Sequence, residues 1–264
     1  MSIPINSRPA TYAVHPLIAL ATFVAGYLAD YLYYRYSGAS TWVAVAIITI
    51  VLSLLLPASV TATFTKRNTW RALLLGKPRS PSLSIYLLIA TVLFVPAYIC
   101  LTLILAHYWT PVRRVIFWDL REMREVVRTT PWYLVAPGGF FFAFTEEFMY
   151  RGFIMNSLRR WGITAAILIS ALCFAAAHHT IGKLIPMTIA GSWFAYVALR
   201  SGSIWVSSTS HFIVNAMLLG AAILYTSSSP SRYTPLPNPS PWWLLAILPS
   251  IVFGVWLIEN QSRK

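Results

Sequence analysis

The sequence predicts an all-α, polytopic membrane protein, and two features of its composition carry that prediction. Hydrophobic residues make up 58% of the 264 positions and charged residues only 10%, with a mean hydropathy of +0.65. Soluble domains carry about 25% charged residues, so this chain is not one of them. Apolar segments of spanning length recur along the chain, and such segments must be helical in lipid to satisfy their backbone hydrogen bonds.

Eight apolar segments follow one another, and Trp and Tyr residues cluster near several of their ends, as is typical of membrane interfaces. They span residues 16–34, 41–60, 84–108, 132–158, 162–181, 184–199, 203–225 and 241–258. The sixth segment is short, so seven spans is an alternative. Residues 1–264 are therefore interpreted as a single integral membrane domain, with no cleavable signal peptide at its start.

Residues 112–128, between the third and fourth segments, have a different pattern. One set of apolar residues recurs at helical spacing, and four arginines lie opposite. The apolar set is Val112, Ile116, Leu120, Met123 and Val127, and the arginines are Arg114, Arg121, Arg124 and Arg128. This pattern predicts an amphipathic helix lying in the membrane interface. A connector on the membrane surface is the favoured interpretation, and a gate beside an active site is the alternative.

The formal net charge of +13 does not indicate nucleic acid, because the basic residues lie mostly in short loops between apolar segments. Anionic headgroups favour basic residues there, so membrane lipids are the expected partners. With the N-terminus inside, 11 basic residues lie on the inner side and 8 on the other. This slight excess predicts cytoplasmic termini. Cys100 and Cys173 both lie inside spans and show no disulfide or metal-site spacing.

The feature that points to chemistry is the acidic pair Glu146 and Glu147, followed by Arg151, inside the fourth apolar segment. A charge at the centre of a membrane helix costs roughly 2.5–3.5 kcal/mol on insertion scales, so such residues indicate a functional site by default. In a helix Glu147 and Arg151 lie on one face and can form an ion pair. Glu146 is rotated away from that pair, and a partly desolvated Glu suits a general base that activates water.

Other polar residues inside later spans occur in pairs at helical spacing. His211 and Asn215 share one face and can supply neutral hydrogen-bond donors to a developing oxyanion. Phe174 and His178 have the same spacing, which puts an imidazole beside an aromatic ring. Each pair, like the ion pair of Glu147, could instead only stabilise helix packing. Their joint occurrence on three spans favours a site.

At these residues the sequence resembles the CAAX protease and bacteriocin-processing family of intramembrane endopeptidases. Its three motifs, EExxxR, FxxxH and HxxxN, stand here in order, at 146–151, 174–178 and 211–215. The resemblance covers about residues 140–220, within a motif-bearing core of about 132–225. It implies a bundle of about eight helices around a polar cavity.

The resemblance also implies a glutamate-dependent hydrolysis of peptide bonds, without metal or other cofactor. Glu146 and His178 would activate the water, and His211 and Asn215 would bind the oxyanion. Glu147 and Arg151 would be supporting residues. The role of His179, adjacent to His178, stays open. The expected substrate is a membrane-tethered or lipidated peptide or protein, and the expected location is a cell membrane.

Three alternatives remain. A metalloprotease would use Glu146, His178 and His211 as zinc ligands, although no HExxH motif is present. A non-catalytic relative would bind a membrane protein or confer immunity to a peptide toxin. A proton-coupled transporter would use the intramembrane Glu and His residues as a relay.

Overall fold

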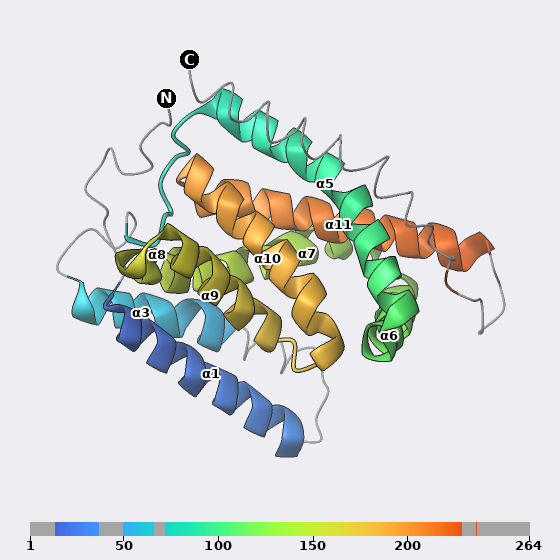
Figure 1. The fold of residues 1–264 in the computed structure, drawn as a ribbon, viewed down its shortest axis with the longest axis horizontal. Helices are drawn as coiled ribbons and strands as arrows, with labels where there is room; N and C mark the ends of the chain where they lie inside the picture. Colours follow the sequence, from blue (N-terminus) through green and yellow to red (C-terminus); the bar gives the residue numbers. More distant parts are fainter. Residues whose placement is uncertain (1–13, 37–49, 66–71, 229–235, 237–264) are drawn as a thin grey trace.

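The computed structural model describes residues 14–36, 50–65, 72–228 and 236, and in this part of the chain every regular element is helical. The predicted all-α class is confirmed. The elements are α1 (Pro16–Tyr36), η1 (Val51–Leu55), α3 (Leu56–Phe64), α5 (Pro81–Tyr108), α6 (Thr110–Thr129), α7 (Trp132–Glu147), η2 (Phe148–Met155), α8 (Asn156–Leu158), η3 (Arg159–Trp161), α9 (Ile163–Ala176), α10 (Ile181–Ser201) and α11 (Ile204–Ser228), arranged as a bundle (Figure 1).

Three of these helices are long and apolar enough to cross a membrane, which makes this an integral membrane protein. They are α5, α10 and the part of α11 that runs from Ile204 to Tyr225. The predicted sixth span, considered short from the sequence, is thus a 21-residue helix. The helix begins at Ile181, three residues before the predicted bound, and so includes Lys183. Shorter apolar helices run over Pro16–Leu32, Val51–Phe64 and Ile163–Ala176.

The fourth predicted span is not a uniform α-helix. The α-helix α7 ends at Glu147, and the eight residues of η2 continue it as a π-helix. A π-helical turn has i→i+5 hydrogen bonds, is rare, and is often found at functional sites. Every residue of η2 is buried. Gly152 allows a close approach here, because a Cβ at this position would lie 2.7 Å from the carbonyl oxygen of Leu73.

The fifth predicted span is shorter than expected. Helix α9 ends at Ala176, and the two histidines lie in the turn that leads to α10. The helix cannot continue because His179 has a left-handed backbone conformation, with φ of 52°, and Thr180 is extended, with φ of −134°. The sequence prediction, which carried this helix through to residue 181, was wrong because no Gly or Pro marks the turn.

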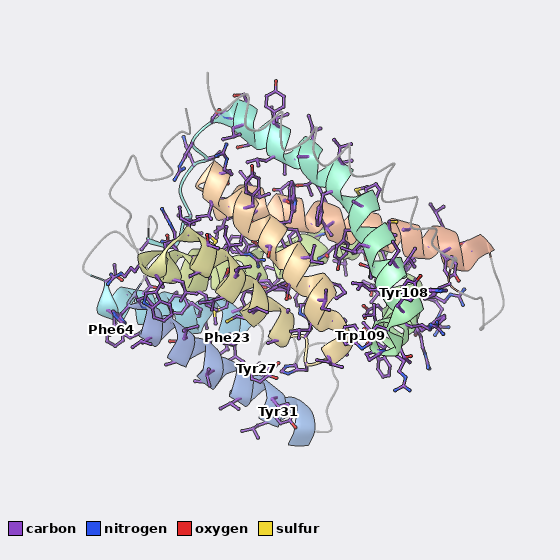
Figure 2. All side chains as sticks on the ribbon, in the orientation of Figure 1. Phe23, Tyr27, Tyr31, Phe64, Tyr108 and Trp109 are labelled. Atoms are coloured by element: carbon purple, nitrogen blue, oxygen red, sulfur yellow. The ribbon has the colours of Figure 1, made fainter. Side chains whose placement is uncertain are left out.

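The main core surrounds η2. Side chains of η2, α9, α10 and α11 bury one another there, and α1 covers them on one side. The central members are Phe153, Ile154, Met155, Phe174 and Ala198. Helix α10 packs along α9, and α11 packs along both α5 and α7. Side chains project outward along α1 and at the junction of α5 and α6, where Tyr108 and Trp109 lie (Figure 2).

Two sequence predictions fall wholly or partly outside the described residues. The eighth predicted span, 241–258, is among them, and so are residues 41–49 at the start of the second. The number of spans, the orientation and the single-domain organisation stay predictions. Residues 112–128 do form a helix, α6, which begins and ends within two residues of the predicted bounds. Its position in the interface stays a prediction.

Candidate active site

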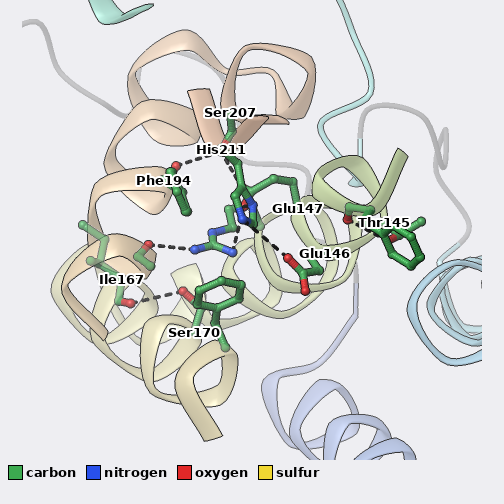
Figure 3. Close-up of polar contacts among 12 residues, drawn as sticks. Thr145, Glu146, Glu147, Ile167, Ser170, Phe194, Ser207 and His211 are labelled. Carbon is green, nitrogen blue, oxygen red and sulfur yellow. Dashed lines mark hydrogen bonds and ion pairs between the residues drawn. The ribbon is translucent and has the colours of Figure 1, made fainter. Parts of the chain in front are cut away.

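Glu147 is the centre of a fully buried polar cluster. Its Oε1 atom lies 3.0 Å from Nη1 of Arg151, so the ion pair predicted from their spacing is present. The same oxygen lies 3.1 Å from Nδ1 of His211, and the Ser207 hydroxyl donates a hydrogen bond to Oε2. These contacts bring together η2, α11 and the end of α7 (Figure 3). The carboxylate therefore contacts three partners and is not accessible to solvent.

Arg151 is held from several sides as well. Its Nη2 donates a hydrogen bond of 2.9 Å to the carbonyl oxygen of Gly191 on α10. The guanidinium carbon lies 4.8 Å from the ring centroid of Phe174 and 5.5 Å from that of Phe194. Such cation–π contacts strengthen when water is excluded. Arg151 thus links η2 to α9 and α10.

Glu146 differs from its neighbour because a third of its side chain, 33%, is exposed. Its Oε2 lies 3.5 Å from Nε2 of His211. The imidazole of His211 is therefore placed between the two glutamates, with Nδ1 toward Glu147 and Nε2 toward Glu146 (Figure 3). Phe194 stacks on this imidazole at 4.3 Å between centroids, with an interplanar angle of 19°. One acid is thus buried and paired, while the other is accessible.

His178 lies just beyond the end of α9, partly buried. Its Nδ1 lies 2.9 Å from the carbonyl oxygen of Phe174. A carbonyl oxygen only accepts hydrogen bonds, so Nδ1 carries the proton and Nε2 of the neutral ring is left with a lone pair. The rings of His178 and His211 both pack edge-on against the ring of Phe174, with centroid distances of 5.0 and 5.7 Å. The structure therefore brings Glu146, His178 and His211 into one neighbourhood from three separate elements.

The remaining two residues are placed differently. Asn215 lies one turn after His211 on α11, and its side chain is exposed. His179, whose role the sequence left open, faces the neighbouring helix α1. Its Nε2 lies 2.9 Å from Oδ2 of Asp30, and its ring lies 4.7 Å from that of Tyr27.

A comparison with family models identifies the family of the segment that carries these residues. Residues 128–217 match the model described as type II CAAX prenyl endopeptidase Rce1-like. This segment belongs to the CAAX protease family. This family is one of proteases, and its matched segment runs from the end of α6 into α11 and includes all six candidate residues. Comparisons with curated proteins and with solved structures each found no match.

Two further residues of this CAAX-protease segment, Ser207 and Phe194, belong to the site although no sequence motif includes them. Ser207 precedes His211 by four residues on α11, so helical spacing places both on one face, toward Glu147. The polar run Ser207–Ser210 in an otherwise apolar helix was a usable signal. Nothing in the sequence marks Phe194 as the residue that stacks on His211, because it is one aromatic residue among many.

The metalloprotease alternative requires a group of side chains that can bind a metal ion together. Among the residues that the structure describes, no group of three or more His, Cys, Asp or Glu side chains could hold a metal ion. Glu146, His178 and His211, the zinc ligands of the metalloprotease alternative, do not form a group of this kind. Two of these three residues, Glu146 and His211, face each other directly instead.

Proposed function

We propose that this protein is an intramembrane endopeptidase that hydrolyses a peptide bond of a membrane-tethered or lipidated peptide or protein. The observation that carries the proposal is the difference between the two glutamates. Glu147 is buried and paired, whereas Glu146 is accessible and faces His211, whose ring packs on the same aromatic residue as that of His178. Membership of a protease family supports hydrolysis, and the long apolar helices support a substrate held at the membrane.

In the first step, the carboxylate of Glu146 takes a proton from a water molecule as the resulting hydroxide attacks the carbonyl carbon of the peptide. His178 assists by accepting a hydrogen bond from the same water at Nε2. Its hydrogen bond to the carbonyl of Phe174 supports this role, because it fixes the ring orientation and the tautomer. An accessible Glu beside a neutral His is a suitable arrangement for general-base catalysis.

The attack creates a tetrahedral intermediate whose oxygen carries negative charge. His211 and Asn215, one helical turn apart, are the proposed donors to this oxygen. Because Nδ1 of His211 faces Glu147, its Nε2 is the atom on the side of Glu146 and of the proposed oxyanion. The buried carboxylate of Glu147 fixes the orientation of this ring, which makes Glu147 a positioning residue.

In the last step, the intermediate collapses and the bond between carbon and nitrogen breaks. The proton held by Glu146 passes to the leaving nitrogen, so that the products are a carboxylic acid and an amine. Glu146 then returns to its carboxylate form. Apart from the water and the substrate, every group in these steps is a side chain of this protein.

The test compares Glu146→Gln with the matched control Glu122→Gln, which removes an exposed acid on α6 outside the site. Membrane-peptide proteomics of cells carrying each variant identifies substrates, and a lipidated fluorogenic peptide built from the top candidate then measures turnover by purified protein. We expect Glu146→Gln to remove turnover while the control and wild type are equal. Undiminished turnover by Glu146→Gln would refute the proposal.

The same preparation separates the alternatives. The metalloprotease hypothesis is tested by measuring the metal content of the protein and its turnover after chelation. It requires stoichiometric zinc and loss of activity when the zinc is removed. The hypothesis of a non-catalytic binding or immunity protein is tested by complementation with the Glu146→Ala variant. Such a protein would retain its function in the cell when it carries this variant.

A further inference from the structure

A cavity separate from the glutamates lies between α5, α6, α10 and α11. Its volume is about 300 Å³, at the small end of the range for ligand sites, which is roughly 300–1,000 Å³. Most of its lining is apolar and comes from all four helices, including Ile99, Leu103, Ile116, Met187, Leu218 and Ala222. None of the six candidate active-site residues lines it.

The apolar stripe of α6, predicted from the sequence, lines this cavity. Four of its five predicted members, Val112, Ile116, Leu120 and Met123, line the cavity. The fifth, Val127, is 41% exposed. The stripe therefore faces the other helices of the bundle over most of its length, and α6 forms one wall of the cavity.

The cavity lies at one end of the long apolar helices. Its lining residues come from the last turns of α5, the first turns of α10 and the last turns of α11. Helix α6 packs tightly at this end, because a Cβ at Gly182 would lie only 2.3 Å from the carbonyl oxygen of Pro111. The cavity therefore lies beside α6, at the end of the bundle where α5 leads into α6 (Figure 1).

One ion pair provides the charged part of the lining. Nζ of Lys183 lies 2.9 Å from Oδ1 of Asp119, and both side chains are about three-quarters buried. Burial raises the pKa of the Asp119 carboxyl above its ordinary value, and the Lys183 ammonium opposes that shift. The two charges compensate each other, so the rest of the lining carries no uncompensated charge from this pair.

The outer face of α6 is basic. Arg114, Arg121 and Arg124 are exposed there. Two of the acids on this helix have partners within it, since Glu125 pairs with Arg128 at 2.9 Å and Glu122 accepts a hydrogen bond from Trp118. The excess of positive charge matches an anionic headgroup at the membrane surface.

We propose that this cavity binds one hydrocarbon chain of an anionic membrane lipid, whose headgroup lies against the arginines of α6. The apolar lining, the position at the end of the membrane helices and the basic outer face all point to this occupant. The site is distinct from the glutamates, so it stands whether or not the chain hydrolyses peptides.

The test uses purified full-length protein in vesicles of phosphatidylcholine that contain a trace of phosphatidylglycerol with a photoreactive diazirine at mid-chain. Mass spectrometry maps the adducts. We expect them on the cavity-lining segments of α6 and α11, and we expect unlabelled phosphatidylglycerol to suppress them. Ala222→Phe fills the cavity and should remove most of these adducts, whereas Leu224→Phe, on an exposed position of the same helix, should leave them unchanged.

The headgroup is tested separately on the wild-type fold. Arg114→Gln removes one exposed charge and should lower the labelling preference for phosphatidylglycerol over a phosphatidylcholine probe by about fivefold, equivalent to about 1 kcal/mol for one arginine near the surface. Adducts spread evenly over the lipid-facing helices, or insensitive to unlabelled lipid, would overturn the site. Equal labelling by the two probes would overturn the anionic headgroup. Neither measurement depends on turnover, so failure here is distinct from failure of the proposed function.

Discussion

Replacing Glu147 by Gln should destabilise the protein far more than the same change at Glu146. Glu147 and Arg151 are both fully buried, and their charged atoms are 3.0 Å apart. The amide retains the shape of the side chain but removes the charge that compensates the guanidinium. Breaking a buried pair by removing one partner costs about 3–5 kcal/mol, because the other charge is left uncompensated.

The remaining partners of Arg151 limit this loss without cancelling it. The carbonyl of Gly191 and the rings of Phe174 and Phe194 still contact the guanidinium, but none of them carries a negative charge. Glu146 lies 3.5 Å from its ionic partner His211, and a third of its side chain is exposed. Its replacement by Gln should therefore change the free energy of unfolding by no more than about 0.5 kcal/mol.

Thermal unfolding in detergent, followed by tryptophan fluorescence, measures this difference. For a chain of this size a loss of about 3–5 kcal/mol lowers Tm by roughly 6–20 °C. Glu146→Gln should unfold within about 2 °C of wild type. A Tm for Glu147→Gln as high as that of Glu146→Gln would refute the reasoning, because it would mean that Arg151 does not depend on this carboxylate.

A double variant supplies the internal control. Glu147→Gln combined with Arg151→Met removes both charges, so no buried charge is left without a partner. Replacement of a whole buried pair by neutral groups is often nearly neutral for stability. The double variant should therefore regain much of the stability that either single variant loses, and the coupling energy should exceed about 0.5 kcal/mol. Additive losses would instead indicate that the pair contributes through packing alone.

Further variants test the neighbouring contacts. Ser207→Ala removes a hydrogen bond to the buried carboxylate and should cost about 1.5–3 kcal/mol in thermal unfolding; an unchanged Tm would exclude that bond as a contributor. Gly182→Ala places a Cβ against the backbone of α6 and should cost about 1–3 kcal/mol, whereas Gly220→Ala, with open space around it, should be neutral or stabilising; equal effects would contradict the close approach. Asp30→Asn should cost about 0.2–1 kcal/mol through its partly exposed pair with His179, and only at low salt; a loss that persists in 1 M salt would show that the pair is not electrostatic.

Part of the site was predictable because helical spacing decides which residues share a face. The pairing of Glu147 with Arg151 follows from four residues of separation, and it persists although η2 is π-helical. The same reasoning put His211 and Asn215 one turn apart on one helix. Composition was sufficient for the all-α membrane class, because a chain this apolar must satisfy its backbone hydrogen bonds within helices.

Contacts between distant segments were not predictable from spacing. No residue near His211 in the sequence indicates that its imidazole lies between two glutamates that precede it by more than sixty positions. The end of α9 before His178 depends on one left-handed residue, His179, which is held by Asp30 and Tyr27 of α1. Asp30 precedes His179 by 149 positions in the sequence.

The sequence by itself thus determined that this is a helical membrane protein, that two acids and an arginine share one apolar segment, and that three motifs follow in order. Only the tertiary structure decided that Glu146 is the accessible acid, and that the apolar stripe of α6 lines a cavity. The physical reason is that hydrogen bonding within a helix is local and sets the direction of every side chain. Which neighbour that side chain meets depends on how helices far apart in the chain pack together.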